Sequence, residues 1–243
     1  AQINASAGTE PVLIDAETRA LLDYADTVWR ESDGLFDLTS GVLRKAWNFS
    51  SGQVPSASTL EPLLARVGWQ RVQRTKETVY LPEEGMELDF GGCVKEYAAD
   101  SVISVLQRAG VSHALVELAG DIATLGDRGD GHAWQVGIRG PELTNSPVAS
   151  LALTGQALAS SGDYERFIEL DGKRYGHILN PLTGWPVHGL AAVSVSAPQC
   201  LVAGSAATLA MLRSESEALQ WLEDLGLPWV AVNHRGEVRS SGL

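Results

Sequence analysis

Apolar and polar positions repeat with a helical period in some stretches of the chain and with a strand period in others. Asp15 stands before an apolar stripe that includes Leu22, Ala25 and Val28, and this pattern predicts a capped helix that ends at Gly34. Ser58 and Glu61 have the spacing of a capping box and predict a second helix. Helical spacing also predicts helices over residues 94–108, about 200–212 and about 215–225.

Strand-like patterns lie between these helices. They predict strands near 71–73, 78–81, 88–90, 113–118, 134–138, 148–153, 190–197 and 229–232. No composition shift or Gly/Pro-rich linker interrupts this order. We therefore predict one α+β domain over residues 1–243, with mixed sheets and packed helices.

The region 158–184 carries the densest group of polar side chains. The run 158–167 predicts a strand entering a Gly-Asp turn, Asp171-Gly172 predicts a two-residue hairpin turn, and 177–184 predicts a strand ending in an Asn-Pro turn. One hairpin-like unit would gather these groups: Ser160, Ser161, Asp163, Tyr164, Arg166, His177, Asn180 and Thr183. Such groups either form a site or only brace their own loops, and both readings stay open.

These runs resemble the signature of the FAD:protein FMN transferases, the thiamine-biosynthesis-lipoprotein type of flavin transferase. In that family a Ser-Gly-Asp-Tyr segment precedes a His-Ile-x-Asp-Pro-x-Thr-Gly segment, and here they read 161–164 and 177–184. The resemblance implies a T-fold-like architecture and a contact of Ile178 with FAD. Within such a site an imidazole suits the group that helps to deprotonate the incoming hydroxyl, which makes His177 the candidate; a structural hydrogen bond between strands is the alternative role.

A glycine turn between a strand and a helix offers backbone N–H groups to an anion, and the segment Asp89–Lys95 has this layout. It resembles the family's Asp-x-Gly-Gly-x-x-Lys-Gly-Tyr motif. The resemblance places Asp89 and Lys95 on FAD, with Lys95 steadying phosphate charge, and the Gly92 carbonyl on a magnesium ion. Glu96 stands where the family usually has glycine.

The segment Gly34–Thr39 resembles the family's Gly-Ala-Phe-Asp-Pro-Thr motif, which implies that Leu35, Phe36 and Asp37 contact FAD. Read without the resemblance, Gly34 ends a helix and Phe36 belongs to the core.

The resemblance weakens in the helix after Pro198. Thr208 matches a family magnesium ligand, but Gly204 stands where the family has its key aspartate. Because a hard cation prefers anionic oxygen, we expect weak magnesium binding and a stronger site in Gly204→Asp. The family's first strand and helix, which precede the matching region, have no counterpart in this chain.

Charge and composition limit the partners. A net charge of −12 argues against nucleic-acid binding and against adsorption to anionic membranes. No stretch is long and apolar enough to span a membrane, so a periplasmic or membrane-anchored location rests on a removed leader, as the resemblance implies. Cys93 and Cys200 lack metal or redox spacing and are expected to be buried.

The predicted activity is magnesium-assisted transfer of FMN from FAD to a Thr or Ser hydroxyl of an acceptor protein, with release of AMP. His177 and Lys95 are the predicted catalytic residues. The alternatives are a non-catalytic FAD-binding or accessory protein with a degraded metal site, and a hydrolase that converts FAD to FMN and AMP.

Overall fold

The computed structural model describes residues 1–141, 146–164 and 166–242, and its chain divides into two compact units. Unit 1 comprises Ala1–Phe90 and Arg166–Val187, and unit 2 comprises Gly91–Glu165 and His188–Leu243. Each unit is discontinuous in sequence. The single domain over residues 1–243 stays a prediction.

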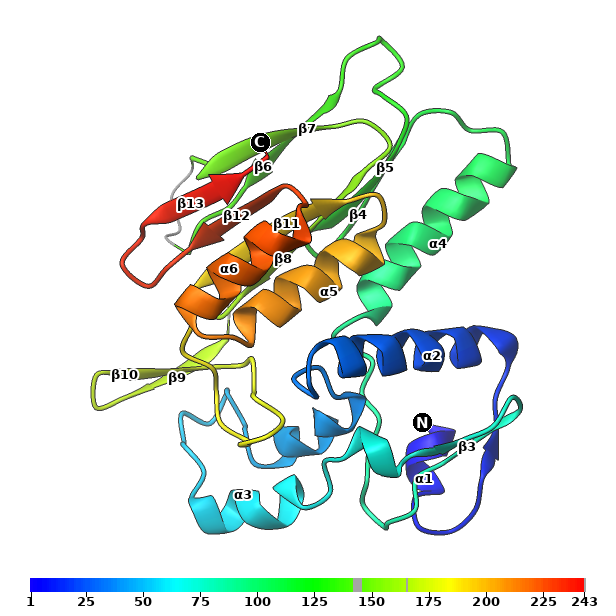
Figure 1. Cartoon of the computed structure of the whole chain (residues 1–243), viewed down its shortest axis with the longest axis vertical. Helices are drawn as coiled ribbons and strands as arrows, with labels where there is room; N and C mark the ends of the chain where they lie inside the picture. Colours follow the sequence, from blue (N-terminus) through cyan, green and yellow to red (C-terminus); the bar gives the residue numbers. More distant parts are fainter. Residues whose placement is uncertain (142–145, 165, 243) are drawn as a thin grey trace. The chain divides into compact units, whose positions relative to one another are not determined.

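Unit 1 combines helices with two small sheets. Its helices are α1 (Gln2–Ala5), α2 (Ala16–Glu31), η1 (Leu38–Lys45), α3 (Ala57–Leu64) and η2 (Trp69–Arg71). Its strands are β1 (Val12–Leu13), β2 (Gln73–Arg74), β3 (Thr78–Tyr80), β9 (Phe167–Leu170) and β10 (Lys173–Gly176). Strands β1, β3 and β2 form one sheet, and β9 and β10 form the hairpin labelled in Figure 1.

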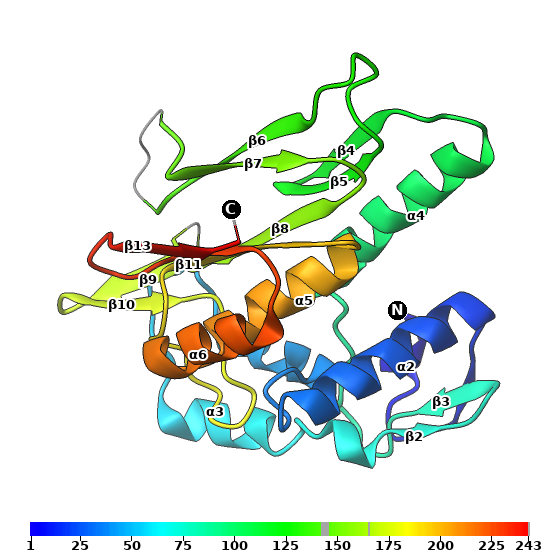
Figure 2. The same ribbon diagram turned by 45° about the horizontal axis from the view of Figure 1, so that its top comes forward.

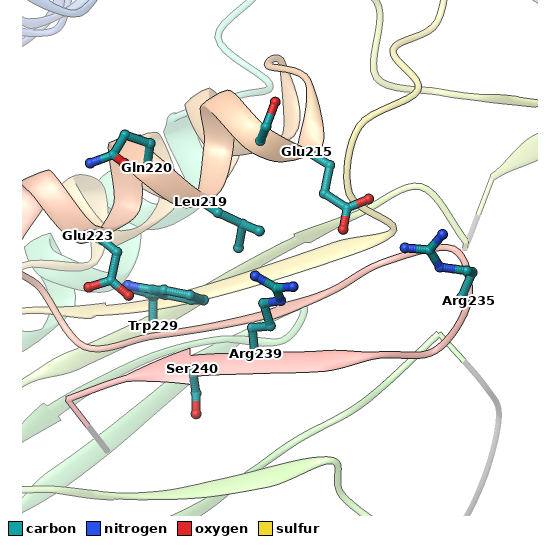
Figure 3. A pocket seen from close by; sticks show the side chains of 9 residues that line it. Glu215, Leu219, Gln220, Glu223, Trp229, Arg235, Arg239 and Ser240 are labelled. Carbon is teal, nitrogen blue, oxygen red and sulfur yellow. The ribbon is translucent and has the colours of Figure 1, made fainter.

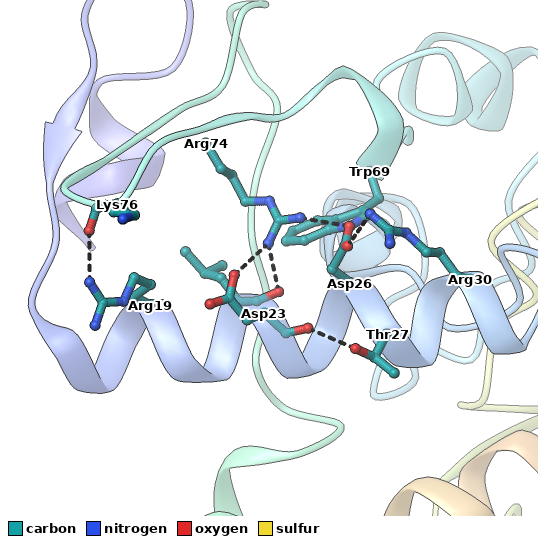
Figure 4. A network of polar contacts seen from close by, with 9 residues as sticks. Arg19, Asp23, Asp26, Thr27, Arg30, Trp69, Arg74 and Lys76 are labelled. Carbon is teal, nitrogen blue, oxygen red and sulfur yellow. Dashed lines mark hydrogen bonds and ion pairs between the residues drawn. The ribbon is translucent and has the colours of Figure 1, made fainter.

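A polar network fastens α2 to the segment that carries η2 and β2 (Figure 4). Asp26 accepts a hydrogen bond from Trp69 Nε1 at 2.9 Å and pairs with Arg74 and Arg30, each at 2.6 Å. The guanidinium of Arg74 also lies 4.8 Å from the Trp69 ring centroid. Several charges around one partly buried carboxylate form a network, which stabilises more than an isolated surface pair.

Unit 2 contains a six-stranded antiparallel sheet in the order β13-β12-β11-β8-β5-β4. A two-stranded sheet of β6 and β7 accompanies it. The strands are β4 (Ala114–Leu118), β5 (Asp121–Leu125), β6 (Trp134–Ile138), β7 (Ala149–Leu153), β8 (Ala157–Gly162), β11 (Ala192–Ala197), β12 (Trp229–Val232) and β13 (Val238–Ser241). The helices are α4 (Val94–Arg108), α5 (Cys200–Met211) and α6 (Glu215–Leu225).

Helices cover one face of the large sheet, and the β6–β7 hairpin covers the other (Figure 2). On the helix face the core consists of small side chains, among them Ala99, Ala159 and Ala203. On the hairpin face Leu158 and Val230 pack against Val136 and Leu153. Since successive strand residues point to opposite faces, β8 serves both cores. The small residues let α5 lie close to the sheet, and this closeness positions the site described below.

The α+β prediction is confirmed, and so are most helices and strands. Asp15 caps α2 by accepting from Thr18 N at 2.7 Å, and α4 and α6 have the predicted bounds. Asp171 and Gly172 both have positive φ, as a two-residue hairpin turn requires.

Three local predictions were wrong. Residues 177–179 form no strand and make only the isolated bridge between Leu179 and Pro186. The cap of α3 is Ser56, which accepts from Thr59 N at 3.2 Å, so Ser58 and Glu61 form no capping box. Residues 88–90 form no strand. In that segment Leu88 N bonds the Asn4 side chain and Asp89 N bonds the Leu38 carbonyl, so its donors are satisfied outside any ladder.

Among the described residues, no helix combines the length and the hydropathy that crossing a membrane requires.

Candidate functional site

Unit 2 brings Lys95, from the first turn of α4, to Asp121 at the start of β5. The two side chains form an ion pair of 2.6 Å, and Asp121 Oδ1 also accepts from Ser160 N at 3.2 Å. Asp121 is 1% exposed. Burial by itself lowers the pKa of Lys95, but the hydrogen bond and charge of Asp121 outweigh it, and the net shift is upward. Lys95 therefore stays charged beside the glycine turn, where it can meet an anion.

Glu96 follows Lys95 and points into the interior of unit 2. Its side chain is 6% exposed, and its Oε2 has no hydrogen-bond partner. Burial raises the pKa of the Glu96 carboxyl, and the nearby Asp121 carboxylate adds to the rise. The side chain fills the space beside Gly204 of α5, where a β-carbon would lie 2.5 Å from Glu96 Cγ.

The predicted metal ligands Gly92 and Thr208 both lie in unit 2. Gly92 belongs to the turn before α4, and Thr208 Oγ1 lies 3.2 Å from Ser161 Oγ at the end of β8. Within the described ranges, no group of three His, Cys, Asp or Glu side chains could hold a metal ion. A cation here would thus need hydroxyl and carbonyl oxygens as well as carboxylate.

Unit 1 contains the predicted flavin-contacting segment 35–37. The helix α2 ends at Glu31, three residues before the predicted end at Gly34. Gly34 has φ of 82° and its N–H bonds the Trp29 carbonyl at 2.9 Å, so it closes the turn that follows α2. Phe36 is buried. Asp37 caps η1, accepting from Thr39 N at 2.7 Å, and its other oxygen accepts from Trp69 N at 3.0 Å. Asp37 therefore organises the backbone, and its contact with FAD stays a prediction.

Asp89 lies directly against η1 in the same unit. Its N–H bonds the Leu38 carbonyl at 2.8 Å, and its carboxylate pairs with Arg44 at 2.6 Å. A β-carbon at Gly41 would lie 2.5 Å from Asp89 Cβ, so glycine is required there for this approach. The structure thus joins the segment 35–37 to Asp89, although the two are far apart in sequence.

The predicted catalytic His177 and the predicted FAD contact Ile178 follow β10 and are both half-buried. The Ile178 carbonyl accepts from Val187 N at 3.0 Å. Asn180 closes the turn that follows, because its side chain accepts from Leu182 N at 2.8 Å. This bond favours a bracing role for Asn180 over a chemical one.

The predicted hairpin-like gathering of 158–184 is divided between the units. Ser160, Ser161, Asp163 and Tyr164 belong to unit 2, whereas Arg166, His177, Asn180 and Thr183 belong to unit 1. The described pocket between α6 and the β12–β13 hairpin contains none of the predicted site residues; Glu215, Trp229 and Arg239 are among those that line it (Figure 3).

Sequence reasoning understated two residues. In the sequence, Glu96 stands out only as a departure from a family motif. The segment Glu117–Asp121 resembles the family's Asn-Leu-Gly-Gly-Asp segment, and Asp121 is equally explained there as a turn residue after a strand. The sequence does contain an indication that Glu96 matters. The chain departs from the family pattern at both 96 and 204, and two such departures in one chain suggest that the two positions are related.

Known proteins resemble this chain along nearly its whole length. A family model described as the ApbE family matches residues 1–230. An FAD:protein FMN transferase of Treponema pallidum is 36% identical over 86% of this chain and 63% of its own length. A Klebsiella pneumoniae FAD:protein FMN transferase is 36% identical over 76% of this chain and 58% of its own length. The chain thus spans less than two thirds of these relatives.

Solved structures agree with this resemblance. The crystal structure of an ApbE protein from Thermotoga maritima superposes with a TM-score of 0.89 and 28% identity, covering 99% of this chain and 80% of its own. The Pseudomonas stutzeri flavinyl transferase ApbE gives 0.86 and 30%, covering 99% and 77%. Because the family model matches 230 of 243 residues and the fold agrees, this chain belongs to the ApbE family.

Proposed function

We propose that this protein transfers FMN from FAD to a Thr or Ser hydroxyl of an acceptor protein and releases AMP. The observation that carries the proposal is the charged Lys95, held by Asp121 beside a glycine turn at the start of α4. Backbone N–H groups at a helix start and a fixed cation suit a pyrophosphate. Relatives named FAD:protein FMN transferase support this choice of anion.

In the proposed reaction the acceptor oxygen forms a bond to the FMN phosphorus, and the phosphoanhydride bond to AMP breaks. His177 takes the hydroxyl proton, and AMP leaves with the bridging oxygen. An imidazole suits this role because it titrates near neutral pH. Leu35, Phe36, Asp37, Asp89 and Ile178 hold the substrate, as proposed from the family pattern.

A magnesium ion bound here would neutralise pyrophosphate charge. Gly92 and Thr208 are the proposed oxygen donors. The buried and unpartnered Glu96 Oε2 in the same unit fits a cation, because buried carboxylate oxygens need a partner. The periplasmic location that the family resemblance implies remains part of this proposal.

A second candidate is a non-catalytic FAD-binding protein, which Gly204 favours by leaving α5 without a carboxylate. One incubation with FAD, Mg²⁺ and an acceptor protein separates the candidates. Covalent flavin on the acceptor supports transfer, free FMN with AMP indicates hydrolysis, and bound intact FAD indicates a binding module.

Two variants test the assigned roles. Lys95→Ala should weaken FAD binding by about 1.5–3 kcal/mol, as expected for one charge-assisted contact, while the control Lys76→Ala should not. His177→Ala should reduce transfer by about 10²–10⁴-fold and spare FAD binding, whereas the exposed His132→Ala should leave both unchanged. Unchanged FAD affinity in Lys95→Ala would refute the pyrophosphate placement.

A further inference from the structure

Two positions on neighbouring helices of unit 2 fit together as a pair. Glu96 on α4 occupies the space beside Gly204 on α5, where a β-carbon would lie 2.5 Å from Glu96 Cγ and 2.8 Å from Oε1. Glycine in a helix interior is unfavourable by roughly 0.5–1 kcal/mol relative to alanine. The presence of glycine at position 204 is therefore explained by the Glu96 carboxyl group, which occupies the space that a side chain at 204 would need.

One oxygen of this carboxyl group lacks the partner that a buried acid usually has, although the group as a whole interacts with Asp121 and with the backbone. Glu96 is 6% exposed and its Oε2 has no hydrogen-bond partner. The adjacent cation, Lys95, pairs with Asp121 at 2.6 Å instead. Buried charges are normally paired or bind a metal, so the Glu96 oxygen has the chemistry of a ligand position.

A second oxygen donor lies one helical turn away. Gly204 and Thr208 are i and i+4 on α5 and share a face, and Glu96 contacts this face at Gly204. Thr208 Oγ1 itself lies 3.2 Å from Ser161 Oγ. Hard divalent cations such as Mg²⁺ bind one or two carboxylates and complete their coordination with neutral oxygens and water.

We propose that Glu96 on α4 supplies the carboxylate of a divalent-cation site shared with Thr208, in place of the carboxylate that α5 lacks at Gly204. This inference rests on the proposed function for the role of the cation, but not for its presence. It unites the two departures from the family pattern, since an acid gained at 96 compensates for the acid missing at 204.

The earlier expectation for Gly204→Asp changes with this geometry. A side chain at position 204 would meet Glu96 Cγ, Cδ and Oε1 within 3 Å, so Glu96 must leave before an aspartate can enter. The single variant is therefore expected to perturb the site rather than to strengthen it. Removing Glu96 and adding the aspartate together should restore the arrangement of the family pattern.

The test is titration of Mn²⁺, followed by electron paramagnetic resonance, and of Mg²⁺, followed by calorimetry. Each titration is run with and without FAD and without acceptor. Glu96→Gln should weaken binding by about 10–100-fold, as expected when one charged partner is lost, and the exposed control Glu223→Gln should not change it. Glu96→Gly should bind as weakly as Glu96→Gln, and adding Gly204→Asp to Glu96→Gly should recover most of the affinity.

Thermal denaturation shows whether each variant is folded and whether Mg²⁺ binds to its folded state. Mg²⁺ should raise the melting temperature of the natural protein and of the double variant, but not that of Glu96→Gln. The proposal is overturned if the natural protein binds no Mn²⁺ in either titration. It is equally overturned if Glu96→Gln binds like the natural protein, or if the double variant recovers nothing over Glu96→Gly.

These outcomes are separate from those of the proposed function. A protein that binds Mn²⁺ through Glu96 but never transfers flavin keeps the site and refutes the transferase. Flavin transfer that is unchanged in Glu96→Gln supports the transferase and refutes the cation site at Glu96.

Discussion

The start of α5 is held by a side chain from another helix, and we predict that removing it destabilises unit 2. Asp100 on α4 accepts from Cys200 N at 2.8 Å and from Leu201 N at 2.9 Å, whereas the local cap residue Gln199 makes no side-chain bond. Asp100 thus replaces the missing cap and joins α4 to α5. The same contact fixes how Glu96 meets Gly204.

The magnitude of the loss follows from the two bonds. An ordinary N-cap substitution costs about 0.5–2 kcal/mol, and a negative charge at a helix N-terminus adds about 0.3–1 kcal/mol. Asp100 is half-buried, so in Asp100→Ala water can accept part of the hydrogen bonding that the Cys200 and Leu201 amides lose. We therefore expect Asp100→Ala to lower the free energy of unfolding by about 2 kcal/mol. Asp100→Asn keeps one acceptor oxygen and should lose about half as much.

The assay is urea unfolding followed by circular dichroism, together with hydrogen exchange of the Cys200 and Leu201 amides. The matched control is Asp224→Ala on the exposed side of α6, with an expected change within about 0.5 kcal/mol. If Asp100→Ala and Asp224→Ala are equally stable and the two amides keep their protection, the reasoning is refuted.

Three further predictions concern stability and accessibility. Ser214→Ala removes the capping box with Glu217 at the start of α6 and should cost about 0.5–2 kcal/mol of unfolding free energy in urea titration; no change would contradict the cap. Trp47→Phe keeps an aromatic ring beside Phe49 but loses the buried bond from Nε1 to the Gly184 carbonyl at 2.8 Å. It should cost at least about 1 kcal/mol in the same assay, and an unchanged midpoint would show that this bond contributes nothing. Burial raises the pKa of the Cys200 thiol and Cys93 is 1% exposed, so both should react with a thiol reagent only after denaturation, and rapid labelling of the native protein would contradict this.

The sequence alone determined the elements whose signals are local. The bounds of α4, α6, β6 and β12 follow from hydrophobic period and nearby stop signals, and the Asp171-Gly172 turn follows from residues that tolerate positive φ. The family resemblance likewise rests on short motifs that can be read without a structure. Each of these features depends on residues within a few positions of one another.

Tertiary structure decided what depends on distant residues. The strand β5 carries Asp121 at its start and was not predicted, because its pairing with β4 and β8 stabilises it more than its own pattern does. The polar run 158–184 looked like one unit, yet its two halves belong to different units, since compactness is a property of contacts rather than of sequence order. Glu96 and Gly204 are meaningful only as a pair, and only the packing of α4 on α5 brings a carboxylate to a glycine more than a hundred residues away.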